Sequence, residues 1–279
     1  MKKIWMKGPK WIRIGVCIIL AIGFIHILHA ITLDRIIQYK EITFYSETWP
    51  IELDGYRIVF VSDTHEISYR RLSRVVDNIN AWQPDILLLG GDIMALQDGR
   101  GGTQHYRQTL GLLARVDAVD GIFGVTGNHD VTRWLFDFME ELEMTPLLNE
   151  GLHIHPGFFL AGVDDYWAGR PCFETATYGA SEGDFVLAIS HNPDAVMSGD
   201  TSNVDLVLSG HTHGGQITFF GLWAPYFTFD NFTTHGQRFL SGWSYGDDGT
   251  PVFVSNGVGE YLPRIFARPQ VIFLTMRSE

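Results

Sequence analysis

The sequence predicts an α/β fold with a parallel sheet, preceded by one membrane-spanning helix. Short β-branched apolar runs alternate with segments that have the apolar spacing of amphipathic helices, and each of these runs ends in polar residues. Strands that alternate with helices in this way typically form a parallel sheet whose two faces are covered. The membrane helix rests on a separate observation, an uninterrupted apolar stretch near the N-terminus.

Composition limits the classes of protein to be considered. The chain has 279 residues, 46% of them hydrophobic, and a formal net charge of −12 from 20 basic and 32 acidic residues. This length suits one sizeable domain or two small ones, and the apolar content excludes a disordered chain. The acidic balance argues against a general nucleic-acid-binding protein, because such proteins neutralise phosphates with Lys and Arg. Two cysteines, Cys17 and Cys172, cannot build a disulfide framework.

The charge is divided unevenly along the chain. Residues 1–13 form a basic tip, and no acidic residue occurs before Asp34. The cations of this tip are Lys2, Lys3, Lys7, Lys10 and Arg13. Without these five, 15 basic residues face 32 acidic ones, so the rest of the chain has a net charge of −17.

An apolar stretch from residue 14 to residue 33 contains no charged side chain and follows Trp5 and Trp11. About 20 such residues cross a bilayer, and tryptophans mark its interfaces. We therefore predict a transmembrane anchor over residues 14–33; a cleaved signal peptide or a buried core helix are the alternatives. Cationic flanks stay in the cytoplasm, which places the body outside it. An interfacial helix with the body on the cytoplasmic face would share this composition.

The body, residues 39–279, is predicted to be one domain. After a short strand or connector at 39–53, its first half alternates strands (57–61, 86–89, 121–126) with helices (72–79, 106–116, 132–142). The second half is richer in strands, which are expected at residues 158–160, 185–190, 204–209, 252–255 and 271–275.

Side chains that bind metals follow five of these strands. They are Asp63, His65, Asp92, Asn128, His129, His191, His211 and His213. Ligand sites in open α/β sheets lie at the C-terminal strand ends, so we expect these side chains to meet. Imidazole and carboxylate groups together bind Mn, Fe or Zn. Two such ions side by side can stabilise the attacking and the leaving oxygen of a phosphoryl displacement. Asp92, alone after its strand, is the natural bridge between two ions.

Each of these residues also has an ordinary structural interpretation. Asp63 or Asp92 could cap a helix, Asn128 could serve only in a turn, and His191 could be a core histidine. For a single isolated residue the structural interpretation would be preferred. Five clusters of metal-binding type at one sheet edge favour a metal site instead.

The ordered motifs resemble the calcineurin-like metallophosphoesterase family. They are Asp63-Thr64-His65, Gly91-Asp92, Gly127-Asn128-His129-Asp130, Ser190-His191 and Gly210-His211-Thr212-His213. The resemblance extends from Tyr56 to about Arg268. The stretch that ends at Gln216, together with residues 256–259 and 263–269, is similar to the YaeI/YkuE group of small bacterial phosphoesterases.

This resemblance implies a four-layer α/β/β/α sandwich that binds two divalent metal ions, Mn²⁺ in the first place and Zn²⁺ or Fe as alternatives. It implies that one ion is held by Asp63, His65 and His213, and the other by Asn128, His191 and His211, with Asp92 bridging them. His129 is implied as the catalytic residue, stabilising charge or protonating the leaving oxygen. The implied reaction is hydrolysis of a phosphodiester or pyrophosphate bond by a metal-bridging hydroxide.

Two positions depart from the family pattern. Many members have an aspartate where this chain has Ala95, and that aspartate supports the catalytic histidine; Asp98 could substitute for it. The first motif continues with Glu66 and Ile67, where a glycine is common. Neither change removes a predicted ligand, so both bear on the rate and the pocket shape and not on the reaction class.

An aromatic segment, residues 219–245, follows the last ligands. Ten of its residues are aromatic: Phe219, Phe220, Trp223, Tyr226, Phe227, Phe229, Phe232, Phe239, Trp243 and Tyr245. An apolar lip that contacts a lipid tail or the bilayer is one interpretation, and a loop that packs on its own aromatic rings is the other.

Together these features predict a phosphoesterase anchored in a bacterial cell membrane, with a lipid or envelope substrate such as UDP-2,3-diacylglucosamine. That substrate is made on the cytoplasmic side, which conflicts with the predicted outward orientation. A tethered phosphodiesterase or protein phosphatase with soluble substrates is the alternative. A non-catalytic scaffold would be expected to lack ligands, whereas all seven positions and His129 are present.

Overall fold

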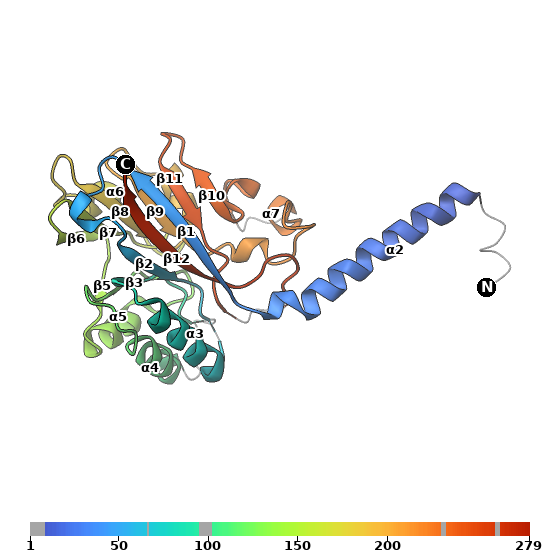
Figure 1. Cartoon of the computed structure of the whole chain (residues 1–279), viewed down its shortest axis with the longest axis horizontal. Coiled ribbons are helices and arrows are strands. Elements are labelled where there is room, and N and C mark those ends of the chain that lie inside the picture. The colour runs from blue at the N-terminus through green and yellow to red at the C-terminus, as the bar shows by residue number, and fades with distance from the viewer. Residues whose placement is uncertain (1–8, 66, 95–101, 230–232, 260–262) are drawn as a thin grey trace.

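Two six-stranded mixed sheets form the body of the protein (Figure 1). The computed structural model describes residues 9–65, 67–94, 102–229, 233–259 and 263–279. The first sheet has the order β1-β12-β2-β3-β4-β5 and the second the order β10-β11-β9-β8-β7-β6. The central strands β2, β3 and β4 run parallel to one another, as do β7, β8, β9 and β11, so their C-terminal ends gather at one edge of each sheet.

The strands are short, as expected for a buried sheet of this size. In the first sheet they are β1 Gln38–Ser46, β2 Arg57–Val61, β3 Ile86–Leu89, β4 Ile122–Gly124, β5 Thr145–Pro146 and β12 Gln270–Ser278. In the second they are β6 Glu150–His155, β7 Phe158–Gly162, β8 Phe185–Ser190, β9 Leu206–Ser209, β10 Gly242–Tyr245 and β11 Pro251–Val254.

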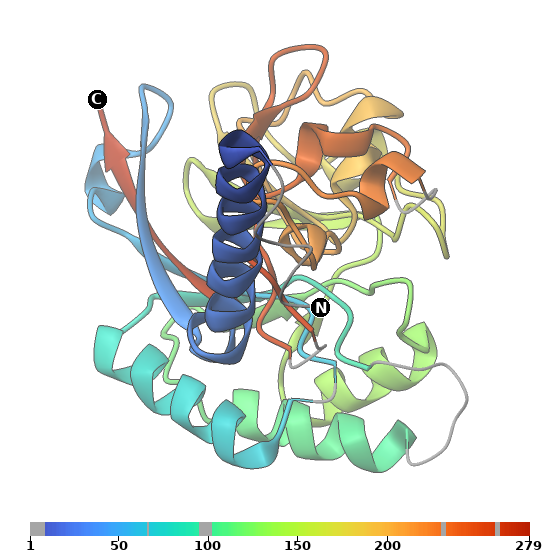
Figure 2. The same ribbon diagram turned by 90° about the vertical axis from the view of Figure 1, so that its right-hand side faces the viewer.

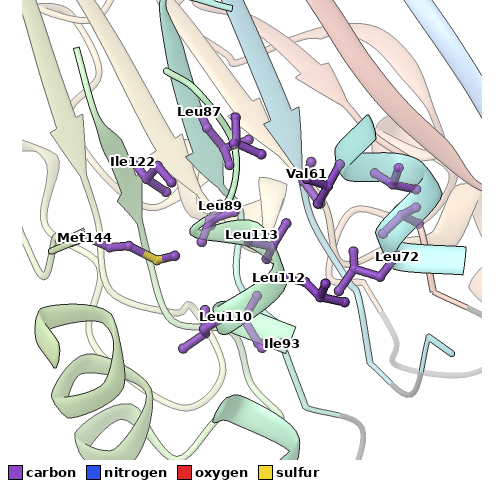
Figure 3. Packing of buried hydrophobic residues seen from close by; sticks show 14 of the residues in the cluster. Val61, Leu72, Leu87, Leu89, Ile93, Leu110, Leu112, Leu113, Ile122 and Met144 are labelled. Carbon is purple, nitrogen blue, oxygen red and sulfur yellow. The ribbon is translucent and has the colours of Figure 1, made fainter. Parts of the chain in front are cut away.

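The first sheet is buried on both faces, which explains its continuous apolar strands. Ile58 and Phe60 of β2 point toward the second sheet, whereas Val59 and Val61 point toward the helices. The helices on that side are α3 Tyr69–Trp82, α4 Gly102–Leu113 and α5 Thr132–Glu141. Figure 3 shows Leu110 and Leu113 of α4 beside Leu87 and Leu89 of the sheet.

The outer face of the second sheet has a thinner cover. Its apolar side chains pack against the short helix α6 Phe173–Ala176 and the 3₁₀ segments η3 Pro193–Met197 and η5 Gly236–Phe239. Further short helical segments are η1 Leu33–Arg35, η2 Ile51–Leu53, η4 His213–Gly215 and α7 Tyr226–Phe229. The four-layer arrangement stays a prediction.

The prediction of one parallel sheet is wrong in two respects. Strand β12 pairs with β2 in the antiparallel sense, and the pairs β6–β7 and β10–β11 are also antiparallel. The face of each sheet that is not covered by helices packs on the other sheet, because the second half of the chain forms a sheet of its own.

Helix α2, Lys10–Ile31, projects from one end of the body (Figures 1 and 2). It is the one helix among the described residues that is long and apolar enough to cross a membrane, and none of its side chains is buried. Its 22 residues span about 33 Å, close to the hydrocarbon thickness of a bilayer. The helix begins four residues before the predicted anchor and ends two residues earlier, while Trp5 and the cations Lys2, Lys3 and Lys7 lie outside the described residues.

Candidate metal centre

The predicted ligands follow strands of both sheets, at the edge where the two sheets meet. Asp63 and Asp92 follow β2 and β3 of the first sheet, and His191 and His211 follow β8 and β9 of the second. Hydrogen bonds join the two edges: the backbone N–H of His211 donates to Oδ1 of Asp63 at 3.0 Å, and Nδ1 of His191 donates to the carbonyl of Gly90 at 2.8 Å. The centre is therefore assembled from both halves of the chain.

The first cluster is formed by Asp63, His65 and His213, all of them buried. Nε2 of His65 and Nε2 of His213 are 3.0 Å apart, and the latter lies 3.5 Å from Oδ1 of Asp63. The ligand atoms of the three residues lie within 4.8 Å of one another. Three ligand atoms this close to one another can bind one cation.

The second cluster is formed by Asp92, His191 and His211. Nε2 of His191 lies 3.3 Å from Oδ2 of Asp92, from Nδ1 of His211 and from Oδ1 of Asn128. The same Oδ2 of Asp92 is 3.8 Å from Nε2 of His65 in the first cluster. Asp92 thus lies between the two clusters, where the sequence places the bridging carboxylate.

Hydrogen bonds select the ring nitrogen that each histidine presents. Nδ1 of His65 donates to the carbonyl of Met94 at 3.0 Å, and Nδ1 of His191 donates to that of Gly90, so both rings turn Nε2 toward the clusters. His213 differs because its Nδ1 accepts from Nη2 of Arg264 at 3.1 Å. Neutral His213 then carries its proton on Nε2, so binding a cation through Nε2 would require the proton to move to Nδ1 and Arg264 to turn away.

The electrostatics favour positive charge at this edge. Burial, with the charge of Asp92 adding, raises the pKa of Asp63. Burial also opposes ionisation of Asp92, but the neighbouring His191 outweighs it and lowers the pKa of Asp92. Burial and the adjacent His65 lower the pKa of His213 well below its usual value, which keeps that ring neutral as a metal ligand must be. Buried carboxylates beside imidazoles and an amide oxygen are a donor set that fits two first-row divalent ions.

Backbone strain is concentrated in the same residues. Asp63, His65, Asp92, His211 and His213 all have positive φ angles, between 43° and 68°. Such conformations are rare outside glycine and persist only where the surrounding structure holds them, most often at functional sites. Gly127 adds a steric requirement, because a Cβ at that position would collide with the carboxylate of Asp92.

Asp130 connects the loops that carry Asp92 and Asn128 through hydrogen bonds. Its Oδ1 accepts from the backbone N–H of Met94 and from the hydroxyl of Tyr106, both at 3.1 Å, and its Oδ2 accepts from the N–H of Gly127 at 2.9 Å. Burial and the charge of Asp92 raise the pKa of Asp130 to about 7.

Replacing Asp130 with Ala is expected to lower the free energy of unfolding by about 3 kcal/mol, since each buried donor left without an acceptor costs about 1–3 kcal/mol. Urea unfolding of the detergent-solubilised chain, followed by tryptophan fluorescence, measures the change. Asp137→Ala is the control, because that carboxylate forms an exposed ion pair with Arg133 at 3.8 Å, worth under about 0.5 kcal/mol. An equal loss of unfolding free energy in the two variants would show that Asp130 does not stabilise these loops.

A cavity of about 590 Å³ opens onto both clusters. His65, Asp92 and Asn128 line it on the metal side, and half-buried His129 lines it beside them. The backbone N–H of His129 donates to Oδ1 of Asp92 at 2.9 Å, and its ring centroid lies 5.5 Å from that of His65. The apolar part of the lining is formed by Trp167, Ile217, Tyr226 and Phe227. All eight predicted site residues therefore come together in space.

Two residues at this site, Asp165 and Arg264, were not assigned roles from the sequence. Asp165 is fully buried, accepts from the N–H groups of Trp167 and Ala168, and positions the ring of Trp167 edge-on to His211 at 4.7 Å. It follows β7, so the strand-end pattern that identifies the other ligands could have identified it. Arg264 is only 1% exposed, and apart from its position in the Pro263–Arg264 motif nothing in the sequence marks it as buried. Of the departures from the family pattern, Ile67 is described and is buried in the core on the helix side of the first sheet. Glu66, Ala95, the substitute Asp98 and Phe232 lie outside the described residues.

Comparisons with known proteins agree with this arrangement. Residues 56–215 match the family model described as calcineurin-like phosphoesterase. YkuE of Bacillus subtilis, described as an uncharacterized metallophosphoesterase, is 31% identical over 263 residues, which cover 88% of this chain and 87% of YkuE. A Helicobacter pylori metallophosphoesterase is 29% identical over 248 residues, covering 84% of this chain and 62% of that protein. A Danio rerio transmembrane protein with a metallophosphoesterase domain is 27% identical over 257 residues, covering 83% of this chain and 55% of that protein.

Proposed function

This chain belongs to the calcineurin-like phosphoesterase family, and we propose that it hydrolyses a phosphodiester or pyrophosphate bond with two divalent metal ions. Mn²⁺ is the first candidate, with Zn²⁺ or Fe as alternatives, because the donor set combines imidazole, carboxylate and amide groups. The observation that carries the proposal is the convergence of two buried ligand clusters on one carboxylate, Asp92, beside a cavity large enough for a substrate. We also propose that the chain is of the YaeI/YkuE type, which its 31% identity to YkuE supports.

The proposed roles follow from these positions. Asp63, His65 and His213 would hold one ion and Asn128, His191 and His211 the other, with Asp92 shared. When bound, such ions activate water for attack and neutralise charge on the phosphoryl oxygens. His129 projects from the cavity wall and would donate a hydrogen bond or a proton to the leaving oxygen. Since no predicted ligand position is lost, catalysis is favoured over a scaffold role.

We further propose that α2 anchors the body, residues 39–279, to a bacterial cell membrane as a single-pass helix. The cations before it favour a body outside the cytoplasm. The zebrafish relative's description as a transmembrane protein supports an anchor. The apolar lining of the cavity supports a lipid or envelope substrate. UDP-2,3-diacylglucosamine, which is made inside the cell, fits only a body on the cytoplasmic face. Protease accessibility of the body in intact cells therefore decides whether that substrate is retained.

The reaction is tested with the full chain in detergent, stripped with a chelator and supplied with Mn²⁺. Hydrolysis of an aryl diester is expected to disappear on chelation and to return with Mn²⁺, because the clusters cannot activate water without a cation. An aryl monoester and a lipid-linked nucleotide are assayed as further substrates. Activity on the soluble diester alone would favour the tethered enzyme with soluble substrates, and no hydrolysis with Mn²⁺, Zn²⁺ or Fe²⁺ would overturn the proposal.

A further inference from the structure

An apolar hairpin follows the metal-binding loop that carries His211 and His213. We call residues 217–226 the aromatic hairpin. The N–H of Phe219 donates to the carbonyl of Trp223 at 2.8 Å, and the N–H of Leu222 donates to that of Phe219 at 3.1 Å. Phe220 and Gly221 between them both have positive φ angles, the pattern of a type I′ turn.

The aromatic hairpin exposes apolar side chains to an unusual degree. Between 38% and 80% of each of six side chains is exposed: Ile217, Phe219, Phe220, Leu222, Trp223 and Tyr226. The whole stretch from Gly214 to Phe229 contains no charged residue. A contiguous patch of this kind marks a surface that contacts a membrane or a protein.

The aromatic hairpin packs directly against helix α2. The ring of His26 lies 5.4 Å from that of Phe219 and 4.6 Å from that of Phe220, and the ring of His29 stacks on Phe266 at 3.9 Å. Figure 1 shows α2 leaving the body at the end where α7 lies, directly after the hairpin. His26 precedes the end of α2 by five residues, about 8 Å along the axis. A helix that spans the bilayer would therefore hold the hairpin at the depth of the interface.

Two residues of the hairpin also belong to the metal cavity. Ile217 and Tyr226 line the same cavity as His65 and Asp92. The apolar surface beside α2 and the apolar wall of the active-site cavity are therefore continuous. An amphiphile could keep its acyl chain on the hairpin while its phosphate reaches the clusters.

We propose that the aromatic hairpin inserts into the interface of the same bilayer that α2 crosses and holds the mouth of the cavity against the membrane, so that lipid-linked phosphoesters enter from it. The substrate part of this inference rests on the proposed function. Aromatic side chains favour the interface, and the uncharged stretch incurs no cost of burying charge there. The rest of the body has a net charge of −17, which anionic headgroups repel, so apolar contact is the attraction that remains.

A fluorescent label tests the insertion without any measurement of activity. The full chain with Cys17→Ser and Cys172→Ser receives one new cysteine, Leu222→Cys or Val119→Cys, is labelled with an environment-sensitive dye and is reconstituted into phosphatidylcholine–phosphatidylglycerol vesicles. The two positions are matched aliphatic sites, 80% and 83% exposed, and Val119 precedes β4 at the opposite strand ends from the metal clusters. The label at position 222 is expected to lose fluorescence with doxyl-labelled lipid and to resist aqueous iodide, and the label at position 119 to do the reverse.

If both labels respond to iodide alone, the hairpin lies in water and the proposal is wrong. Protection of position 222 from both quenchers would indicate a protein partner and would also overturn the bilayer assignment.

A second arm compares substrates. Leu222→Asp is expected to lower turnover of the lipid-linked substrate about tenfold relative to a soluble aryl diester, the loss of one interfacial apolar side chain. If the ratio of the two turnover rates were unchanged, entry of the substrate from the membrane would be wrong, whereas insertion of the hairpin would still stand. A wild-type enzyme inactive on both substrates would overturn the proposed function while the fluorescence result stands.

Discussion

Asp92→Asn is expected to lower kcat for an aryl diester by about a thousandfold or more and to reduce the bound metal from two ions to one or none. The carboxylate is the shared group, with Oδ2 3.3 Å from Nε2 of His191 and 3.8 Å from Nε2 of His65. Metal ions contribute several kcal/mol of charge stabilisation to such a reaction, and each 1.36 kcal/mol is about tenfold in rate. Metal content by mass spectrometry and steady-state kinetics measure the two effects.

The amide replacement separates metal binding from folding. Its side-chain oxygen can still accept from the backbone N–H of His129, as Oδ1 of Asp92 does at 2.9 Å, so the loop is retained. The metal-free variant should therefore still fold, with a melting temperature somewhat below that of the metal-free wild type, because the folded chain favours the charged form of Asp92 beside His191. Asp137→Asn on α5 controls for the loss of an acidic residue. Two bound ions and unchanged kcat would show that Asp92 is not the bridge.

The candidate site can be predicted from the sequence because its residues obey a local rule. Asp63, Asp92 and His191 each follow an apolar strand within a few residues, and parallel strands bring their C-terminal ends together. The rule operates without knowing which sheet a strand joins, which is why the strand pattern predicts that ligands from both sheets meet. Asp165 fits the same rule, but it binds backbone N–H groups, and no histidine accompanies it in the sequence.

The parts of the fold that could not be predicted depend on long-range pairing. Strand β12 pairs with β1 and β2, more than 200 residues away, and an apolar run gives no sign of its direction or its partners. Strand β10 lies within the aromatic segment and alternates in the opposite sense to a core strand, because Trp243 and Tyr245 are exposed whereas Gly242 and Ser244 are half-buried. Arg264 is buried because three acceptors surround its guanidinium, and these come from residues 213, 256 and 267, which no local pattern connects.

His129→Gln is expected to lower kcat by about 10²–10⁴-fold while leaving the metal content at two ions, because proton donation by a positioned side chain contributes an effect of that size. The backbone N–H that contacts Asp92 is present whatever the side chain, so the bridge is not disturbed. His153→Gln on β6 is the control, since that ring lies at the surface and pairs with Asp184 at 2.7 Å.

The leaving group distinguishes the two roles that His129 could have. If the imidazole protonates the leaving oxygen, the variant should lose most activity on a diester with a basic alkoxide leaving group and little on a nitrophenyl diester, whose leaving group needs no proton. If the ring only stabilises charge on the phosphoryl group, the loss should be equal for both substrates. Full activity on both would place His129 outside the chemistry, and the half-buried ring beside His65 would then be a structural neighbour of the metal cavity.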